Sequence, residues 1–348
     1  MKKVFSSFAA LTSMSIGALC HAQTIEISAI EEKRLDQNIE SAPLPKFLQW
    51  GDNEILARYS DGAKTRRHFD VSLGFRYLMT NSFLPKNDNW EYALALAYQG
   101  EFDFFALTRQ SSPVVTTRHN PSLFYTRFRN PEQHRFSSLF VSLEHESNGQ
   151  VTDNLVNLQA EIDAYSNDYQ NDLNVTPSDV FEMAQQTISR SNNFVGFGFN
   201  YQLGNLNGDC DSIFSCTNMQ VKFRYQLDGS PEDELWWIAE QRAELKDYVG
   251  SKVDVETKFV AGDVPQALRL TYQTGQLVGA RPFKRNTFDI RYYIDVPVGR
   301  IASKLFNLEQ QEAFAMPLVI RYHNGYLDEL YNYSMKVSYF AIGLHARY

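Results

Sequence analysis

Nine consecutive residues decide the fold: Val141-Ser142-Leu143-Glu144-His145-Glu146-Ser147-Asn148-Gly149. Successive side chains of a β-strand point to opposite faces, so the odd-numbered residues share one side and the even-numbered residues share the other. The odd-numbered side is apolar but also carries His145 and Ser147, whereas the even-numbered side carries two glutamates. A transmembrane barrel turns its apolar side to lipid and keeps charges in its lumen. The pattern therefore predicts a membrane strand whose histidine and serine meet lipid.

The N-terminus has the three parts of a secretory signal peptide. Lys2 and Lys3 form the charged start, Val4 to Leu19 is apolar, and Cys20-His21-Ala22 offers a small-x-Ala cleavage site. We therefore expect export, with residues 1–22 removed and a mature chain that starts near Gln23. Residues 23–52 are predicted to form a periplasmic extension, and residues 53–348 a transmembrane β-barrel domain.

The composition fits a membrane barrel better than a soluble protein. After the signal peptide no run of about 18 apolar residues occurs, and the mean hydropathy is -0.38 with 21% charged residues. A membrane barrel can have a low mean hydropathy because only alternate residues of its strands touch lipid. Its aromatic girdles raise the content of Tyr and Phe. The 19 Tyr and 25 Phe of this chain match that expectation. The net charge of -8 argues against a nucleic-acid partner. The expected location is the outer membrane of a Gram-negative bacterium.

Alternating segments recur along the mature chain, each with one polar face. The clearest are Phe69–Tyr77, Trp90–Phe104, Val253–Phe259, Leu268–Tyr272, Phe288–Tyr292, Leu318–Tyr322 and Ser338–Tyr348, and the weaker ones are Glu54–Tyr59, Ser122–Phe128, Phe140–Ser147, Asn193–Tyr201 and Gln220–Leu227. Together they give about twelve strands, and an even count suits a closed antiparallel barrel. We therefore predict an all-β transmembrane barrel in a single domain.

The last of these segments supports the membrane assignment separately. It alternates up to a terminal aromatic residue, Tyr348, and so resembles the assembly signal of bacterial outer-membrane barrels. The alternative is the edge strand of a soluble sandwich, which the export signal disfavours.

Three loop features interrupt the alternation. Thr176-Pro177-Ser178-Asp179 precedes Val180–Ile188, and Ser230-Pro231-Glu232-Asp233 precedes Leu235–Leu245, so both loops are predicted to contain a short helix. Cys210 and Cys216 are the only cysteines left after signal cleavage. In an oxidising compartment a disulfide that closes this loop is expected.

The chemistry-bearing residues are a serine, a histidine and an asparagine. Serine needs a base to become a nucleophile, and the base needs a third group to fix its tautomer. His145 and Ser147 are two apart on one strand and therefore share a face. On the neighbouring strand, parity groups Asn193 with Val195 on the lipid side. Asn193 is either a girdle residue near the water boundary or the residue that orients His145.

Four runs carry a family resemblance: His145-Glu146-Ser147-Asn148-Gly149, Ser189-Arg190-Ser191-Asn192-Asn193, Ser111-Ser112-Pro113 and Gly325-Tyr326-Leu327-Asp328-Glu329. Together they resemble the bacterial outer-membrane phospholipase A family, over almost all of the mature chain. The resemblance implies a twelve-stranded barrel that hydrolyses acyl esters of membrane phospholipids, requires Ca²⁺ and is active as a homodimer.

The resemblance also implies a role for each site residue. Ser147 would be the nucleophile, His145 the general base and Asn193 the group that holds the imidazole. The carbonyl of Gln150, the hydroxyl of Ser189 and, from the partner subunit, Ser111 would hold calcium. Hard oxygen ligands of this kind suit Ca²⁺, which would polarise the ester carbonyl.

The chain departs from the family pattern in several places. An insertion at Val151–Ile188 stands where the family has a short turn, so Asn154 and Asn157 are substitutes for Asn193. Gln150 stands where the family has a basic residue. This change should not matter if only the backbone carbonyl of this residue binds calcium. Gln99 matches a glutamine of the family's dimer interface, but parity places it on the polar side.

Three other functions compete with a phospholipase. A lipid A deacylase of the outer membrane also uses His-x-Ser-Asn with a glutamate as third member, and Glu161 is the candidate here, although those barrels are much shorter. A passive channel would make the serine and histidine incidental. A barrel that has lost its activity through the insertion is the third.

Overall fold

The computed structural model describes residues 47–49, 51–59, 68–80, 90–105, 114–130, 133–150, 152–171, 175–205, 216–227, 245–261, 264–277, 283–297, 315–326 and 336–346. Leu44–Ala346 forms one compact unit. The predicted signal peptide and most of the predicted extension lie outside the described residues, as do Ser111, Cys210 and the proposed helix up to residue 244.

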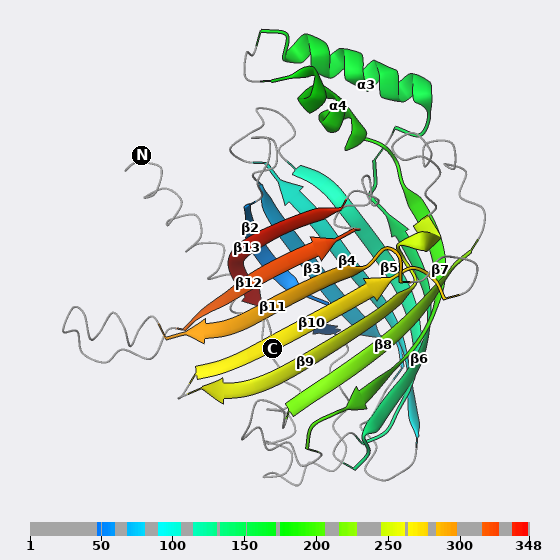
Figure 1. Cartoon of the computed structure of the whole chain (residues 1–348). Coiled ribbons are helices and arrows are strands. Elements are labelled where there is room, and N and C mark those ends of the chain that lie inside the picture. The colour runs from blue at the N-terminus through cyan, green and yellow to red at the C-terminus, as the bar shows by residue number, and fades with distance from the viewer. Residues whose placement is uncertain are drawn as a thin grey trace, which may run out of the picture. The chain divides into compact units, whose positions relative to one another are not determined.

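The described chain forms a ring of twelve antiparallel strands with one short additional strand (Figure 1). The bounds are β1 Phe47–Gln49, β2 Asn53–Tyr59, β3 Phe69–Leu78, β4 Glu91–Phe104, β5 Val114–Phe128, β6 Phe136–Ser147, β7 Ser191–Gln202, β8 Cys216–Leu227, β9 Ser251–Ala261, β10 Val264–Thr274, β11 Thr287–Val296, β12 Met316–Gly325 and β13 Val337–Ala346. From β2 to β13 each strand pairs with the next, and β13 pairs with β2. The barrel is therefore closed and has no free sheet edge in this ring.

The additional strand β1 continues the position of β2 in the wall. Both pair with β3, β1 near Tyr77 and β2 near Phe69. Between them Gly51 has a φ of +69°, a conformation that glycine adopts without a steric penalty. Across this break, the Asn53 side chain accepts a hydrogen bond from the Gly74 amide at 2.6 Å. Phe47–Gln49, within the segment that we expected to form the extension, thus pair with β3 in the wall.

All twelve predicted strands are present, and their bounds differ by a few residues except for β5. That strand starts at Val114 rather than Ser122. Two features hide its first half in the sequence: Pro121 lacks a backbone N–H, and the register against β4 shifts at Glu101/Phe102. A bulge of this kind moves later side chains to the other parity.

The two sides of the wall differ as the alternation predicts. Exposed large hydrophobic residues lie on the outside of nearly every strand: Ile55, Phe75, Leu96, Tyr125, Val141, Leu143, Phe197, Tyr225, Leu270, Ile290, Ile320 and Ile342. Their even spread around the ring is the surface that a hydrocarbon environment requires. The inner side instead carries buried carboxylates, among them Glu144, Glu146 and Asp289, and partly buried arginines such as Arg224.

The insertion after β6 contains two helices, α3 at Leu155–Asp168 and α4 at Pro177–Gln185. The predicted cap of α4 is confirmed, because the Thr176 amide donates to Asp179 Oδ2 at 2.7 Å and Asp179 returns a bond to Thr176. The helix ends before the predicted Ile188, which instead bridges to Thr152.

Helix α3 was not expected from the sequence, since its apolar stripe is short. In the described part of the chain, neither helix has the length and apolar character to span a membrane. A single-turn helix at Leu245–Asp247 precedes β9. Cys216 is disulfide-bonded.

Candidate active site

The predicted reactive residues lie on the outer side of β6, at its end. Val141 and Leu143 are 45% and 54% exposed, whereas Glu144 and Glu146 are buried on the lumen side. His145 and Ser147 therefore continue the lipid-facing row. In the register, His145 lies opposite Asn193 of β7, and Ser147 lies between Ser191 of β7 and a residue of β5, His119.

The structure brings His145 and Asn193 into direct contact. Nδ1 of the imidazole lies 3.0 Å from Oδ1 of Asn193. An amide oxygen accepts hydrogen bonds only, so Nδ1 carries the proton and Nε2 keeps its lone pair. The two substitutes are engaged elsewhere, because Asn154 caps α3 and Asn157 donates to Asp153 at 2.9 Å. An imidazole in this state can take a proton at Nε2.

A buried amide closes the insertion just after the nucleophile candidate. Asn148, with no exposed surface, donates from Nδ2 to the Ile188 carbonyl at 2.6 Å and accepts from the Arg190 amide at 2.9 Å. The backbone N–H of Asn148 donates to the Arg190 carbonyl. The chain thus leaves and re-enters the wall at one point, so the insertion does not displace β7 from β6.

The same amide brings together two of the three predicted calcium-binding residues. Gln150 donates its backbone N–H to Asn148 Oδ1 at 3.5 Å. Ser189 lies between the two residues that Asn148 holds, and its amide donates to the Thr152 carbonyl at 2.7 Å. Gln150 and Ser189 therefore lie on facing segments beside the end of β6, and the third residue, Ser111, lies outside the described chain.

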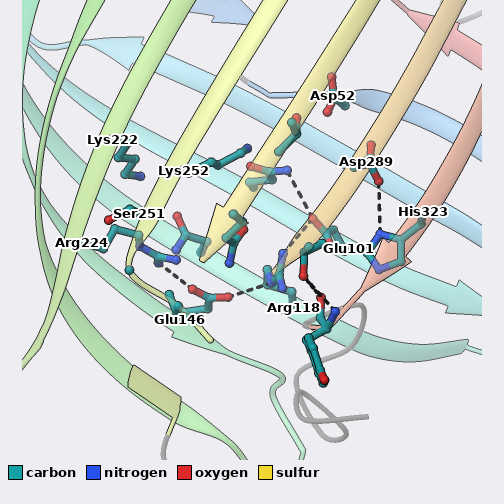
Figure 2. A pocket seen from close by; sticks show the side chains of 18 of the residues that line it. Asp52, Glu101, Arg118, Glu146, Lys222, Arg224, Ser251, Lys252, Asp289 and His323 are labelled. Atoms are coloured by element: carbon teal, nitrogen blue, oxygen red, sulfur yellow. Dashed lines mark hydrogen bonds and ion pairs between the residues drawn. The ribbon is translucent and has the colours of Figure 1, made fainter. Parts of the chain in front are cut away.

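The lumen side of β6 is held by ion pairs, which Figure 2 shows around Glu146. Glu146 contacts Arg118 of β5 at 2.8 Å and Arg224 of β8 at 2.6 Å. Glu144 contacts Lys222 at 2.6 Å and Arg224 at 3.0 Å. Because these contacts come from two strands, β5 and β8, they fix the inner face of β6 and hence the direction of His145 and Ser147 on its outer face.

Two lumenal features have ordinary structural explanations. Gln99 faces the lumen, as parity predicts, with Nε2 lying 3.4 Å from Glu101. His68, Asp70 and Asp103 group their side chains within 4.8 Å of one another, as metal ligands do. His68 Nε2 lies 2.7 Å from Asp70 and 3.5 Å from Asp103, however, so these side chains pair with one another directly.

Sequence reasoning missed His119. Parity counted from Ser122 stops at Asn120-Pro121, so the first half of β5 was left out of the strand pattern. Extending the odd-numbered face from Tyr125 and Leu123 past Pro121 would have placed His119 on the lipid side, one strand from Ser147.

The fold defines an outer-membrane type of β-barrel. No protein-family model and no curated protein sequence matches the chain. Among solved structures it is similar to outer membrane phospholipase A from Escherichia coli, with a TM-score of 0.51 and 12% identity over 87% of this chain and 99% of that one.

Two further structures show the same barrel. The outer membrane phospholipase dimer of Salmonella typhi with bound calcium has a TM-score of 0.53 and 13% identity, over 88% of this chain and 94% of that one. An E. coli active-site mutant with an asparagine replaced by alanine has a TM-score of 0.51 and 11% identity, over 90% and 93%. The chain thus has the barrel fold of outer membrane phospholipase A.

Proposed function

We propose that this chain is a calcium-dependent phospholipase of the outer membrane, which hydrolyses acyl esters of glycerophospholipids. The observation that carries the proposal is the His145–Asn193 hydrogen bond on the lipid-facing side of the wall, with Ser147 on the same face. A polar pair in hydrocarbon is costly unless it serves a purpose. A membrane lipid that approaches laterally would present its ester at this depth, near the end of the strand.

In the proposed mechanism each residue has one task. Ser147 Oγ attacks the ester carbonyl, and His145 Nε2 accepts its proton. Asn193 keeps the proton of His145 on Nδ1, so that Nε2 is free to act as base. His145 then returns the proton to the departing lysophospholipid oxygen, and water repeats the sequence to release the fatty acid from Ser147.

The donor set beside Ser147 fits calcium. The Gln150 carbonyl and the Ser189 hydroxyl are hard oxygen ligands, and the Asn148 amide holds their two segments together. Ser111 of the partner subunit would complete the set in a homodimer. When bound, the ion would polarise the ester carbonyl. The related Salmonella structure is a dimer with bound calcium, which supports both parts of this proposal.

Two alternatives lose support. A passive channel would give no role to the outward contact between His145 and Asn193. For a lipid A deacylase the third member would be Glu161, which belongs to α3, whereas the side-chain hydrogen bond of His145 is with Asn193.

The test is fatty-acid release by the full-length barrel from mixed micelles of phosphatidylcholine and detergent. We expect release with calcium, none with a chelator, and a loss of about 10³-fold or more for Ser147→Ala. Ser338→Ala, another outward serine near the same end of the barrel, is the matched control and should keep full activity. Hydrolysis that persists in Ser147→Ala, or that occurs only with lipopolysaccharide, would exclude the proposal.

A further inference from the structure

A second imidazole lies beside Ser147 on the outer wall. His119 of β5 is the direct cross-strand partner of Ser147. Side chains in such a pair have Cβ atoms about 4.5–5.5 Å apart, closer than the roughly 6.5–7 Å between residues two apart on one strand. By backbone position, His119 is therefore at least as close to the nucleophile candidate as His145.

His119 is held by aromatic residues of β4. The Tyr98 hydroxyl lies 2.5 Å from His119 Nδ1, and the Phe102 ring meets the imidazole edge-on at 5.7 Å. Gly100, directly across from His119, makes this arrangement possible, because a Cβ there would lie 2.8 Å from the Tyr98 hydroxyl. The imidazole is thus fixed in orientation by one hydrogen bond and two rings.

The tautomer of His119 follows from counting unmet polar groups. If the Tyr98 hydroxyl donates to Nδ1, Nε2 carries the proton, and one donor is left without a partner among the described residues. If Nδ1 donates instead, both the phenol proton and the Nε2 lone pair lack partners there. Unmet polar groups are costly on a lipid-facing surface. The first arrangement is favoured, and it leaves Nε2–H as a donor.

This donor lies at the end of β6. His119 Nε2 lies beside Gly149, since a Cβ built on that glycine would lie 3.1 Å from it. Gly149 has a φ of +63°, which glycine tolerates, and its lack of a Cβ leaves this space open. The two imidazoles beside Ser147 thus have opposite hydrogen-bonding groups at Nε2. In His145, whose Nδ1–H donates to Asn193, Nε2 is an acceptor. In His119, whose Nδ1 accepts from Tyr98, Nε2–H is a donor.

From this geometry we infer that His119 is a second catalytic histidine, whose Nε2–H donates to the oxygen of the scissile ester as negative charge develops on it. Tyr98 is its positioning residue. The inference rests on the proposed function. A fixed donor aimed at the developing oxyanion stabilises the transition state more than the ground state, so the contribution is expected in kcat.

The experiment measures kcat and KM for phosphatidylcholine hydrolysis with saturating calcium, using full-length barrels. His119→Phe keeps the ring packing but removes the donor, and we expect kcat to fall by about 10²–10³-fold with KM nearly unchanged. His119→Gln supplies an amide donor and should recover about tenfold of that loss. Tyr98→Phe should lower kcat by about tenfold, because the His119 imidazole loses the hydroxyl that fixes its tautomer. Tyr322→Phe, an outward tyrosine of β12, is the matched control.

Each result decides the inference. Wild-type kcat in His119→Phe would show that the ring only packs, and equal loss in His119→Gln and His119→Phe would show that His119 takes a proton instead. Denaturant unfolding shows whether His119→Phe folds. If it does not, the His119→Gln and Tyr98→Phe variants still test the inference. If the wild-type barrel hydrolyses lipid through Ser147 and these variants do not differ from it, this inference alone is wrong. If the wild-type protein neither hydrolyses lipid nor reacts with a fluorophosphonate at Ser147, the proposed function fails with it.

Discussion

Two places at the same end of the barrel carry polar side chains on the lipid-facing surface. On β6 and β7, Asn193 lies opposite His145. On β12 and β13, six strands around the ring, Asn324 lies opposite Ser338, and its amide contacts the Ser338 hydroxyl at 3.4 Å. An outward asparagine or serine near the rim is therefore not in itself a sign of chemistry.

The difference between the two places is the imidazole. His145 and His119 face outward on adjoining strands, whereas His323 and His345, on β12 and β13, are buried on the lumen side. The β12–β13 rim shows what a girdle requires: amides and hydroxyls that bond to one another near the water boundary. The rim formed by β5, β6 and β7 adds two imidazole rings, and these distinguish a candidate active site from a girdle.

The largest expected effect tests whether the outer surfaces of β6 and β13 both face lipid. Val141 and Ile342 lie near the middle of β6 and β13 and are both exposed. Replacing either with arginine should destabilise the barrel in lipid by about 2–4 kcal/mol, because a charge would enter hydrocarbon. Denaturant unfolding in lipid vesicles measures this. If Val141→Arg were neutral while Ile342→Arg were not, the wall around the candidate site would not face lipid.

The next effect separates an orienting amide from a girdle amide. Asn193→Ala should lower phospholipid hydrolysis by about 10–100-fold, since His145 loses the partner that holds its ring and tautomer. Asn324→Ala removes an equivalent outward amide from the other rim and should leave activity unchanged. Fatty-acid release from mixed micelles compares the two. Equal rates would mean that both asparagines belong to the girdle.

The smallest effect concerns the lumen side of the same strand. Glu146→Gln should cost about 1–2 kcal/mol of unfolding free energy, because charge-assisted bonds to Arg118 and Arg224 weaken. The cost stays moderate because Arg118 keeps Glu101 and Arg224 keeps Glu144. Asp289→Asn, in the lumen beside β12, should cost a similar amount. Only the Glu146 variant should also slow hydrolysis, and a loss in both would mean that lumenal charge affects the whole barrel rather than β6.

The alternation of side chains was enough to predict the wall, its twelve strands and the outward direction of His145 and Ser147. This worked because burial in a barrel follows a period of two, which is local in the sequence. The start of β5 could not be read in this way, since Pro121 and the bulge interrupt the period there.

Contacts between distant segments were out of reach of the pattern. The ion pair of Asp52 with Arg269 joins residues 217 positions apart, and no local period indicates it. Helix α3 has Leu158 as its only buried residue, so its apolar stripe was too weak to recognise. Its signals were the Asn154 cap and the spacing of Leu158, Ile162 and Tyr165, which pack with α4.

The Asn148 side chain, which holds the two ends of the insertion together through Ile188 and Arg190, has a consequence for how this protein can change over time. A loop whose two ends meet at a single side chain can be lengthened, shortened or exchanged without altering the register of the strands that bear it. The outer surface above the candidate site is therefore a place where new recognition elements can be acquired while the chemistry below stays as it was.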